Sequence, residues 1–346
     1  MRVSLGLPTC TEGMMYPVPF ASAEQIIEFA RLAERLGYHS VWGNDHMTTQ
    51  RYVREEFPNP PNFWEVLITL SFVAAQTSSL RVATGVLIPA MRRDIVVLAK
   101  QLATLDQLSS GRLIVGMGVG AYREEFEALH PRWDVRRGEL LEESVQALQR
   151  LFSQRVASWE GQYYAYQNVE MFPKPIQNPL PIYIGGNNVH AIRRSARYAQ
   201  GWMGAGMPPD QLRTSVDMLR DLAHQHGRDP DTIDVAPQFS ACLDKSHEAA
   251  IRRYRSSRMY RHLVSLSGTS LKDQVAAGVA FEEIDLVGTA DDILERIGRL
   301  REAGVTHLCG LLFAANSAGE LTDQIQAFAE EVMPRIEAKE ATDPWA

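Results

Sequence analysis

The strongest constraint on the fold is a unit that recurs along the whole chain: a short apolar run, a loop, and a helix with an apolar stripe. Eight such runs lie at residues 3–7, 40–43, 81–88, 113–117, 182–186, 201–203, 235–241 and 306–313. They are almost continuously apolar, as parallel strands covered on both faces are. A doubly wound open sheet usually has fewer strands and would leave the last units unplaced. The sequence therefore predicts an α/β fold, a (β/α)8 TIM barrel.

Helix boundaries are marked by local signals. Ser22 with Gln25 forms a capping box, and Asp94 and Thr289 are N-cap residues for later helices. Gly111 ends the helix that Asp94 begins, because glycine tolerates the left-handed conformation of a C-terminal turn. These signals predict where helices begin and end without any knowledge of tertiary contacts.

Two stretches interrupt the alternation. Residues of about 155–180, after the fourth strand, contain the hairpin-like segment 159–164 and several prolines. Residues of about 245–285, after the seventh strand, are helical in pattern without a clear strand. We interpret both as insertions into one domain that spans residues 1–346.

Composition excludes several classes of function. The formal charge is −7, from 35 basic and 42 acidic residues, which argues against a nucleic-acid surface. The three cysteines, Cys10, Cys242 and Cys309, form no CxxC pair and are expected to be reduced thiols of a cytoplasmic protein. There is no apolar signal segment and no run long enough to cross a membrane. Without HExxH, paired CxxC or EF-hand patterns, no metal site is expected.

One histidine occupies a position suited to catalysis. In a barrel, functional groups follow the carboxyl ends of strands, and His46 comes directly after the second strand, preceded by Asp45. An imidazole can pass a proton near neutral pH. The alternative interpretation is a structural loop histidine bonded to Asp45.

Three glycine-containing segments lie within or directly after predicted strands. Residues 116–121 fit the pattern GxGxxG/A, although a dinucleotide fold usually places this turn after its first strand. Residues 185–188 lie between a strand and a helix start, where free amides favour an anion. Residues 84–89 contain a glycine inside a strand, which often marks a bulge. Each segment also has a purely structural interpretation. In that interpretation residues 116–121 form a tight turn between a strand and a loop, residues 185–188 a turn with an Asn cap, and residues 84–89 a strand in which glycine serves packing alone.

In combination, these segments resemble the bacterial luciferase-like superfamily of flavin and deazaflavin oxidoreductases. The similar stretches, in chain order, are residues 33–42 leading to Asp45 and His46, then 83–86, 102–113, 116–120, 124–126, 181–187 and 286–289. The resemblance extends over nearly the whole chain and implies the same barrel.

The resemblance also implies a set of cofactor-binding residues, in the loops named above. It implies that Asp45, Gly118, Val119, Gly120 and Glu124 lie at or beside a flat ring, that Gly85, Val86 and Ile88 support it, and that Gly185, Gly186, Asn187, Asn188 and Val189 hold a phosphate. Gly85–Val86 matches a position where deazaflavin-dependent members have a non-proline cis peptide in a bulge.

The deazaflavin branch is the better match, so the implied cofactor is coenzyme F420, with FMN as the alternative. The implied function is hydride transfer between F420 and a small organic substrate, with His46 as proton donor or acceptor. The alternatives are an FMNH2-dependent monooxygenase that uses O2 and a non-catalytic flavin-binding barrel. A flavin or deazaflavin reductase would supply electrons, and family members are often homodimers.

One departure from the family's pattern argues against the substrate of its sugar-6-phosphate dehydrogenases. These have an acidic residue directly after the Gly-x-Gly turn, where this chain has Ala121. Aromatic and soft side chains near the expected mouth would suit an apolar or conjugated substrate, namely Trp42, Met47, Phe63, Trp64, Tyr122 and Trp202. The alternative for each of them is a place in the core.

Overall fold

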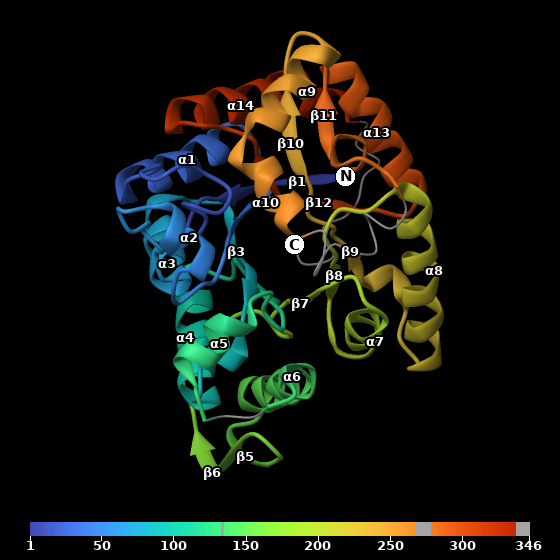
Figure 1. Cartoon of the computed structure of the whole chain (residues 1–346). Helices are drawn as coiled ribbons and strands as arrows, with labels where there is room; N and C mark the ends of the chain where they lie inside the picture. Colours follow the sequence, from blue (N-terminus) through green and yellow to red (C-terminus); the bar gives the residue numbers. More distant parts are fainter. Residues whose placement is uncertain (133–134, 267–277, 337–346) are drawn as a thin grey trace.

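The computed structural model describes residues 1–132, 135–266 and 278–336. At its centre lies a ten-stranded sheet with the strand order β11-β10-β12-β1-β2-β3-β4-β7-β8-β9, and every neighbouring pair is parallel (Figure 1). These strands are β1 (Arg2–Leu7), β2 (Ser40–Gly43), β3 (Arg81–Leu87), β4 (Leu113–Met117), β7 (Ile182–Gly185), β8 (Gly201–Met203), β9 (Asp234–Val235), β10 (Ser240–Leu243), β11 (Leu286–Gly288) and β12 (His307–Phe313).

Backbone hydrogen bonds close this sheet into a barrel. Strand β9 pairs with β8, and the residues that follow β9 bond to β12 on the other side: the amide of Cys309 donates to Pro237 O at 3.2 Å, and that of Leu312 to Phe239 O at 3.1 Å. The segment from β9 to β10 therefore fills one strand position between β8 and β12. The predicted (β/α)8 barrel is confirmed.

The seventh strand differs in detail from the prediction. Residues 235–241 were expected as one strand, but the structure has two short strands, β9 and β10, separated by Pro237. Proline has no amide hydrogen to donate, which interrupts a strand at that point. Strand β11 was not expected, because three apolar residues before a capped helix carry too little periodicity to be assigned.

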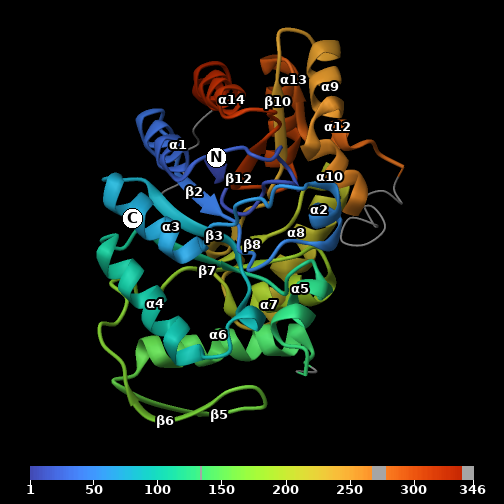
Figure 2. The ribbon, with the colours of Figure 1, turned by 60° about the vertical axis from the view of Figure 1, so that its left-hand side comes forward.

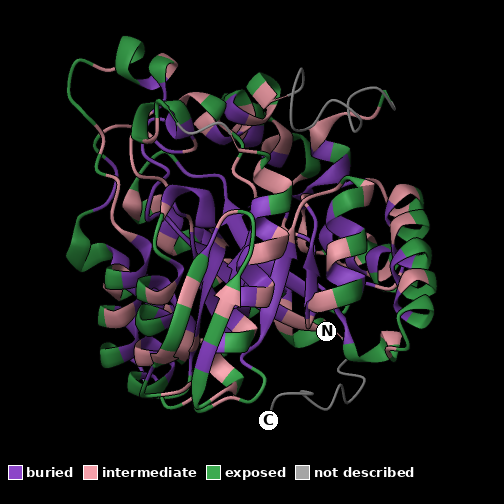
Figure 3. Cartoon of the chain, turned by 90° about the horizontal axis from the view of Figure 1, so that it is seen from below, coloured by how far each residue is buried: buried purple, intermediate pink, exposed green. Residues whose placement is uncertain are grey.

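Helices surround the barrel, and the buried residues gather in the strands and on the inner helix faces (Figure 3). They are α1 (Ala23–Arg35), α2 (Arg51–Glu56), α3 (Val66–Gln76), α4 (Ile95–Leu108), α5 (Arg123–Leu129), α6 (Arg137–Ser153), α7 (Val189–Tyr198), α8 (Pro209–Gln225), α9 (His247–Ser256), α10 (Arg258–Leu266), α12 (Phe281–Ile284), α13 (Ala290–Glu302) and α14 (Ala318–Glu331), with 3-10 turns η1 (Pro89–Met91), η2 (Pro230–Thr232) and η3 (Met333–Arg335). No helix in the described part of the chain is long and apolar enough to span a membrane.

The predicted helix caps are present. Ser22 and Gln25 form the capping box of α1, and the Asp94 carboxylate accepts from the second and third amides of α4. Gly111 has φ +78°, the left-handed conformation expected after α4. Helix α2 was not predicted. It has no side-chain N-cap bond and buries only Val53, so neither capping nor periodicity marks it.

The two interrupting stretches lie outside the barrel strands. Strands β5 (Val156–Glu160) and β6 (Ala165–Glu170) form a separate antiparallel hairpin beside α6 (Figures 1 and 2). The second stretch, 245–285, contains α9, α10 and α12, and its residues 267–277 lie outside the described residues. The description of both as insertions stays a prediction.

The amino end of the barrel interior is filled by a buried polar network. The imidazole of His307 bonds Ser4 Oγ through Nε2 at 2.6 Å and Asp234 Oδ2 through Nδ1 at 3.2 Å. Asp234 also pairs with Arg2 at 2.6 Å. Although this is the order of groups in a Ser-His-Asp triad, His307 is fully buried. The network therefore closes one end of the barrel and leaves the carboxyl ends of the strands for function.

Candidate active site

The loops after β2, β3, β4 and β7 meet at the carboxyl ends of neighbouring strands, because these four strands are consecutive in the sheet. His46 follows β2, the bulged segment of Val86 belongs to β3, and Gly118 and Gly186 follow β4 and β7. The segments that sequence analysis selected separately are thus brought to one end of the barrel.

His46 is held by a carboxylate from another strand unit. Its Nδ1 lies 2.9 Å from Oε2 of Glu125, and its side chain is 13% exposed while that of Glu125 is 1% exposed. The other oxygen of Glu125 accepts from the amides of Met47 at 2.5 Å and Thr48 at 3.3 Å. The carboxylate therefore fixes both the imidazole and the loop that carries it.

Glu125 and not Asp45 binds His46, so the partner expected for this histidine in the structural alternative is wrong, and the catalytic role of His46 stays a prediction. The buried Asp45 carboxylate binds the Arg92 guanidinium and accepts from the amide of Ile88 at 2.9 Å. Arg92 also pairs with Glu65 at 2.8 Å. This ion pair ties the end of β2 to the segment after β3. A ring contact of Asp45 stays a prediction.

Sequence reasoning missed Glu125, although it lies within the quoted segment 124–126. It selected Glu124, whose carboxylate accepts from the amide of Arg51 at 3.0 Å, at the start of α2. The available signal was helix periodicity: Tyr122 and Glu125 are three residues apart at the start of α5, and such residues share a helix face. Phe126, next to Glu125, is buried and fixes the orientation of α5.

The glycine segments enclose Val86. Strand β3 is bulged between Thr84 and Leu87, and the Gly85–Val86 peptide is cis, as predicted. A Cβ on Gly118 would lie 2.6 Å from Val86 Cγ2, and a Cβ on Gly185 would lie 2.9 Å from Val86 Cγ1. Real Cβ atoms do not approach so closely, so both positions require glycine. The Val86 side chain thus fills the space that a Cβ at either position would occupy.

The remaining ring-binding candidates adjoin this cradle. A Cβ on Gly120, which has φ +77°, would lie 3.2 Å from Cδ1 of the buried Ile88. Val119 is partly buried and packs against the main core. The backbone carbonyls of Val119 and Gly120 accept from Arg137 at 3.2 and 2.8 Å. The loop is thereby anchored at the start of α6.

The predicted phosphate loop combines a capped helix start with one unpaired donor. Asn188 caps α7, of which Val189 is the first residue, by accepting from the amide of Ala191 at 3.0 Å. Asn187 Oδ1 accepts from Ala205 N at 2.7 Å, whereas its Nδ2 is buried without a hydrogen-bond partner among the described residues. A buried donor without an acceptor is uncommon in native proteins, and it suits a site for an anion.

Two of the six expected pocket residues lie in the core. Trp42 is 1% exposed and donates to Ser40 Oγ at 2.8 Å inside the barrel, and Trp202 is fully buried and donates to Gly186 O at 2.8 Å. Both tryptophans are therefore core residues, which was the alternative to a place in the pocket. The hydrogen bond from the Trp202 indole also holds the loop after β7 in place.

The other four are partly buried around the loop that carries His46. The rings of Phe63 and Tyr122 lie 5.8 and 5.9 Å from the imidazole, and Met47 follows His46 directly. The indole Nε1 of Trp64 is buried without a partner in the described part of the chain. Contact with a substrate stays a prediction for these residues.

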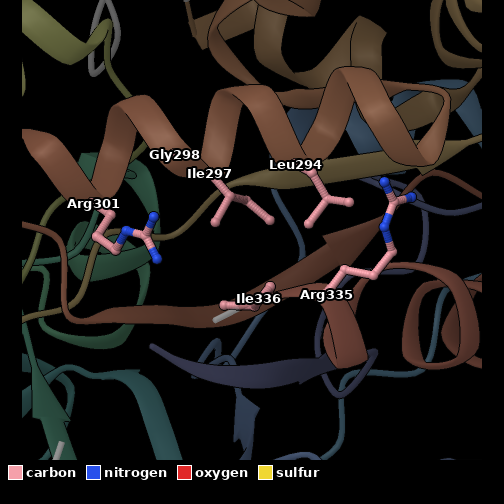
Figure 4. Close-up of a pocket in the computed structure, with 6 residues that line it drawn as sticks. All are labelled: Leu294, Ile297, Gly298, Arg301, Arg335 and Ile336. Carbon is pink, nitrogen blue, oxygen red and sulfur yellow. The ribbon is translucent and has the colours of Figure 1, made fainter. Parts of the chain in front are cut away.

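A separate cavity lies between α13 and the segment at η3. Figure 4 shows its lining residues on α13 and η3, namely Leu294, Ile297, Gly298, Arg301, Arg335 and Ile336. Arg335 pairs with Asp291 in the first turn of α13 at 2.6 Å, so the cavity extends along this helix and none of its lining residues lies in the loops after β2, β3 or β4. This cavity is therefore not part of the site around His46.

Together, a closed parallel barrel, a carboxylate-bound histidine and a glycine-lined cradle at the carboxyl ends of its strands define a barrel enzyme. The family model for "Luciferase-like monooxygenase" matches residues 1–307. The chain belongs to the luciferase-like monooxygenase family, as its sequence motifs indicated.

Individual relatives span almost the whole chain. An F420-dependent glucose-6-phosphate dehydrogenase of Amycolatopsis mediterranei is 27% identical over 340 residues, which cover 92% of this chain and 97% of the relative. The solved structure of an F420-dependent secondary alcohol dehydrogenase, in complex with an F420-acetone adduct, has a TM-score of 0.78 at 20% identity and covers 97% and 99% of the two chains. That of the monooxygenase RslO1 from Streptomyces bottropensis also has a TM-score of 0.78, at 25% identity, with 96% and 99% covered.

Proposed function

We propose that this chain is an oxidoreductase that uses coenzyme F420 to transfer a hydride to or from a small organic substrate. The observation that carries the proposal is the position of the Glu125-bound His46 at the same barrel end as the cradle around Val86. Curated relatives support the choice of cofactor, because three that cover more than nine tenths of this chain are named F420-dependent glucose-6-phosphate dehydrogenases.

The residues of the cradle fit a flat cofactor with a phosphate. Glycine at 118 and 185 lets the Val86 side chain pack directly against both loops, and the partly exposed Val86 then offers an apolar surface on which a planar ring can lie. The buried, unpaired Nδ2 of Asn187 lies next to the start of α7, where the helix dipole also favours negative charge. When bound, the deazaflavin supplies a carbon that exchanges a hydride with substrate.

In this proposal His46 moves the proton that accompanies the hydride. The Nδ1–H of His46 donates to Glu125, which leaves Nε2 as the nitrogen that can face substrate. That nitrogen accepts the hydroxyl proton of an alcohol or, once protonated, donates to a carbonyl oxygen. Glu125 is buried and bound to two amides, so it keeps the ring oriented and balances the charge of an imidazolium.

An FMN-dependent monooxygenase is the second candidate. It is supported by the similarity to RslO1, whose TM-score equals that of the F420-dependent alcohol dehydrogenase. A monooxygenase consumes O2 when a flavin reductase supplies FMNH2, whereas a deazaflavin enzyme does not.

Titration of the purified chain with F420 and FMN, side by side, tests the choice of cofactor. We expect F420 to bind with at least tenfold higher affinity, measured from the fluorescence of each cofactor. The variant Gly118→Ala places a methyl group against Val86 and should weaken binding of the true ligand, whereas Gly298→Ala, where a Cβ has open space, is the control. Tight binding of FMN alone, with O2 consumption, would reject the proposal in favour of the second candidate.

A further inference from the structure

Helix α3 carries no charge on any side, including the side that faces away from the barrel. A surface helix normally presents charged residues to solvent, as α13 does with the exposed Asp291, Glu295 and Arg299. The outer face of α3 instead carries Ile68 and Phe72, which lie one helical turn apart. Because helices that are apolar all round are normally buried, we expect the outer face of α3 to be covered.

Exposed apolar side chains continue from α3 across α4 to the segment before β7. Helices α3 and α4 are neighbours (Figures 1 and 2). Lys100 of α4 donates to the carbonyl of Phe172. Asp106 of α4 accepts from the amide of Ile176 at 2.7 Å, so this segment lies along α4. We define the α3–α4 face by the large apolar side chains exposed on these three segments, namely Ile68, Phe72, Val97, Leu108, Phe172 and Ile176.

The α3–α4 face gathers the most exposed apolar side chains of the molecule. They are between 52 and 70% exposed, and every large apolar side chain of the described residues that is more than half exposed belongs to this face. A fully exposed large side chain presents roughly 150–200 Å², so together these side chains expose roughly 500–600 Å². A stable interface buries about 800 Å² per partner, of which somewhat more than half is apolar. The α3–α4 face therefore has the apolar area that one subunit of a stable dimer contributes.

The few charged groups beside this face are bound within the chain. The ammonium of Lys174 donates to two backbone carbonyls at 2.5 and 2.6 Å, and that of Lys100 donates to the carbonyl of Phe172. Glu170 pairs with Arg155 at 2.9 Å. A partner with a strongly acidic or basic surface would therefore find little to pair with.

The composition of the face suits contact with its own copy. A twofold axis places the same patch on both subunits, so a charged patch would bring like charges together, whereas an apolar patch does not. Gln101 and Gln107, exposed on the same helix as Val97 and Leu108, each have a donor and an acceptor and can pair with an amide of the same kind. We propose that two copies of this chain form a homodimer through the α3–α4 face, related by a twofold axis.

The proposed interface is connected to the candidate active site through the first turn of α3. Glu65 caps α3 by accepting from the amide of Ile68 at 2.7 Å, and it pairs with Arg92 at 2.8 Å. Arg92 in turn binds Asp45, next to His46. A second copy that covers Ile68 therefore supports this ion pair from outside the barrel. The dimer does not depend on which cofactor the chain binds.

Sedimentation equilibrium of the purified chain at micromolar concentrations tests the proposal. We expect the parent chain to have twice the mass of the monomer. The double variant Phe72→Glu with Val97→Glu should have the mass of the monomer, because the interface would bury unpaired carboxylates. Circular dichroism verifies that this variant is folded. The matched control is Met218→Glu with Val264→Glu, which changes exposed apolar side chains of α8 and α10 and should remain dimeric.

Thermal unfolding gives an independent measure. The Tm of the parent chain should rise with protein concentration, because dissociation accompanies unfolding, whereas the Tm of the double variant on the α3–α4 face should not. Should that variant fail to fold, Leu108→Lys, at the exposed end of α4, tests the same face by sedimentation. A parent chain of any mass other than that of the dimer, a dimer that persists in the variants of the α3–α4 face, or dissociation of the control variant would overturn the proposal.

Discussion

The imidazole of His46 and the carboxylate of Glu125 are 79 residues apart in sequence, and Nδ1 and Oε2 lie 2.9 Å apart in the structure. One residue follows β2, and the other lies in α5 after β4. The parallel order β2-β3-β4 places both loops at the same barrel end, and the pair spans the bulged end of β3 between them. This contact links the candidate proton-transfer group to the loop of the glycine cradle.

Replacement of Glu125 by Gln should slow turnover. The amide keeps the length of the side chain but removes the negative charge that balances an imidazolium. We expect kcat to fall by about 10- to 100-fold, a smaller loss than the 10²–10⁴-fold expected when the acid–base group itself is removed, because His46 remains in place. Kinetics under saturating F420 measure this. Glu127→Gln is the control, because Glu127 also lies in α5 but is exposed and pairs with Arg123 at the surface; an equal loss in both variants would contradict a specific role for Glu125.

Replacement of His46 by Ala should remove proton transfer and leave the cofactor site intact. We expect turnover to fall by about 10²–10⁴-fold. The F420 dissociation constant should stay within a factor of about two, because the cradle residues are not altered. Full activity in this variant would show that another group moves the proton.

Filling the cradle should weaken cofactor binding. In Gly118→Ala the new Cβ would lie 2.6 Å from Val86 Cγ2, so Val86 must move. We expect at least a tenfold loss of F420 affinity in a fluorescence titration. Restored affinity in the double variant Gly118→Ala with Val86→Ala would attribute the loss to this contact. Gly298→Ala, where a Cβ has open space in α13, is the control and should bind normally.

Acid should destabilise the fold in a defined window. Burial lowers the pKa of both His262 and His307 from 6.5 to about 4. The unfolded chain therefore binds protons at these groups that the folded chain does not, and stability is lost as the pH falls from about 6.5 to about 4. Asp285 acts in the opposite direction, because burial raises its pKa from 3.8 to about 6. Because the two histidines lower the stability on acidification and Asp285 alone raises it, we expect a net loss of folding stability between pH 7 and pH 5.

Urea denaturation at pH 7 and pH 5 measures this effect. We expect a lower midpoint at pH 5 and a smaller difference in His262→Gln, which keeps a group able to bond Tyr52. His224→Gln, at the exposed end of α8, is the matched control and should behave like the parent chain. A urea midpoint that is higher at pH 5 than at pH 7 would contradict the prediction that protonation of the buried histidines destabilises the fold.

Local sequence signals predicted the elements that depend on local interactions. The caps at Ser22, Asp94 and Thr289 and the left-handed turn at Gly111 are present, because each is decided within a few residues. Helix α2 and strand β11 were missed, since their short segments lack both a cap and a periodic stripe. The apolar runs sufficed for the barrel, because parallel strands must be covered on both faces.

The sequence by itself thus determined the alternation of strands and helices, the helix ends, and the segments that meet at the carboxyl end of the barrel. Only the tertiary structure decided that Glu125, and not Asp45, binds His46, and that Trp42 and Trp202 lie in the core. The physical reason is distance along the chain. Periodicity and capping act over a few residues, whereas the choice between neighbouring carboxylates depends on how α5 and the loop after β2 pack across the barrel.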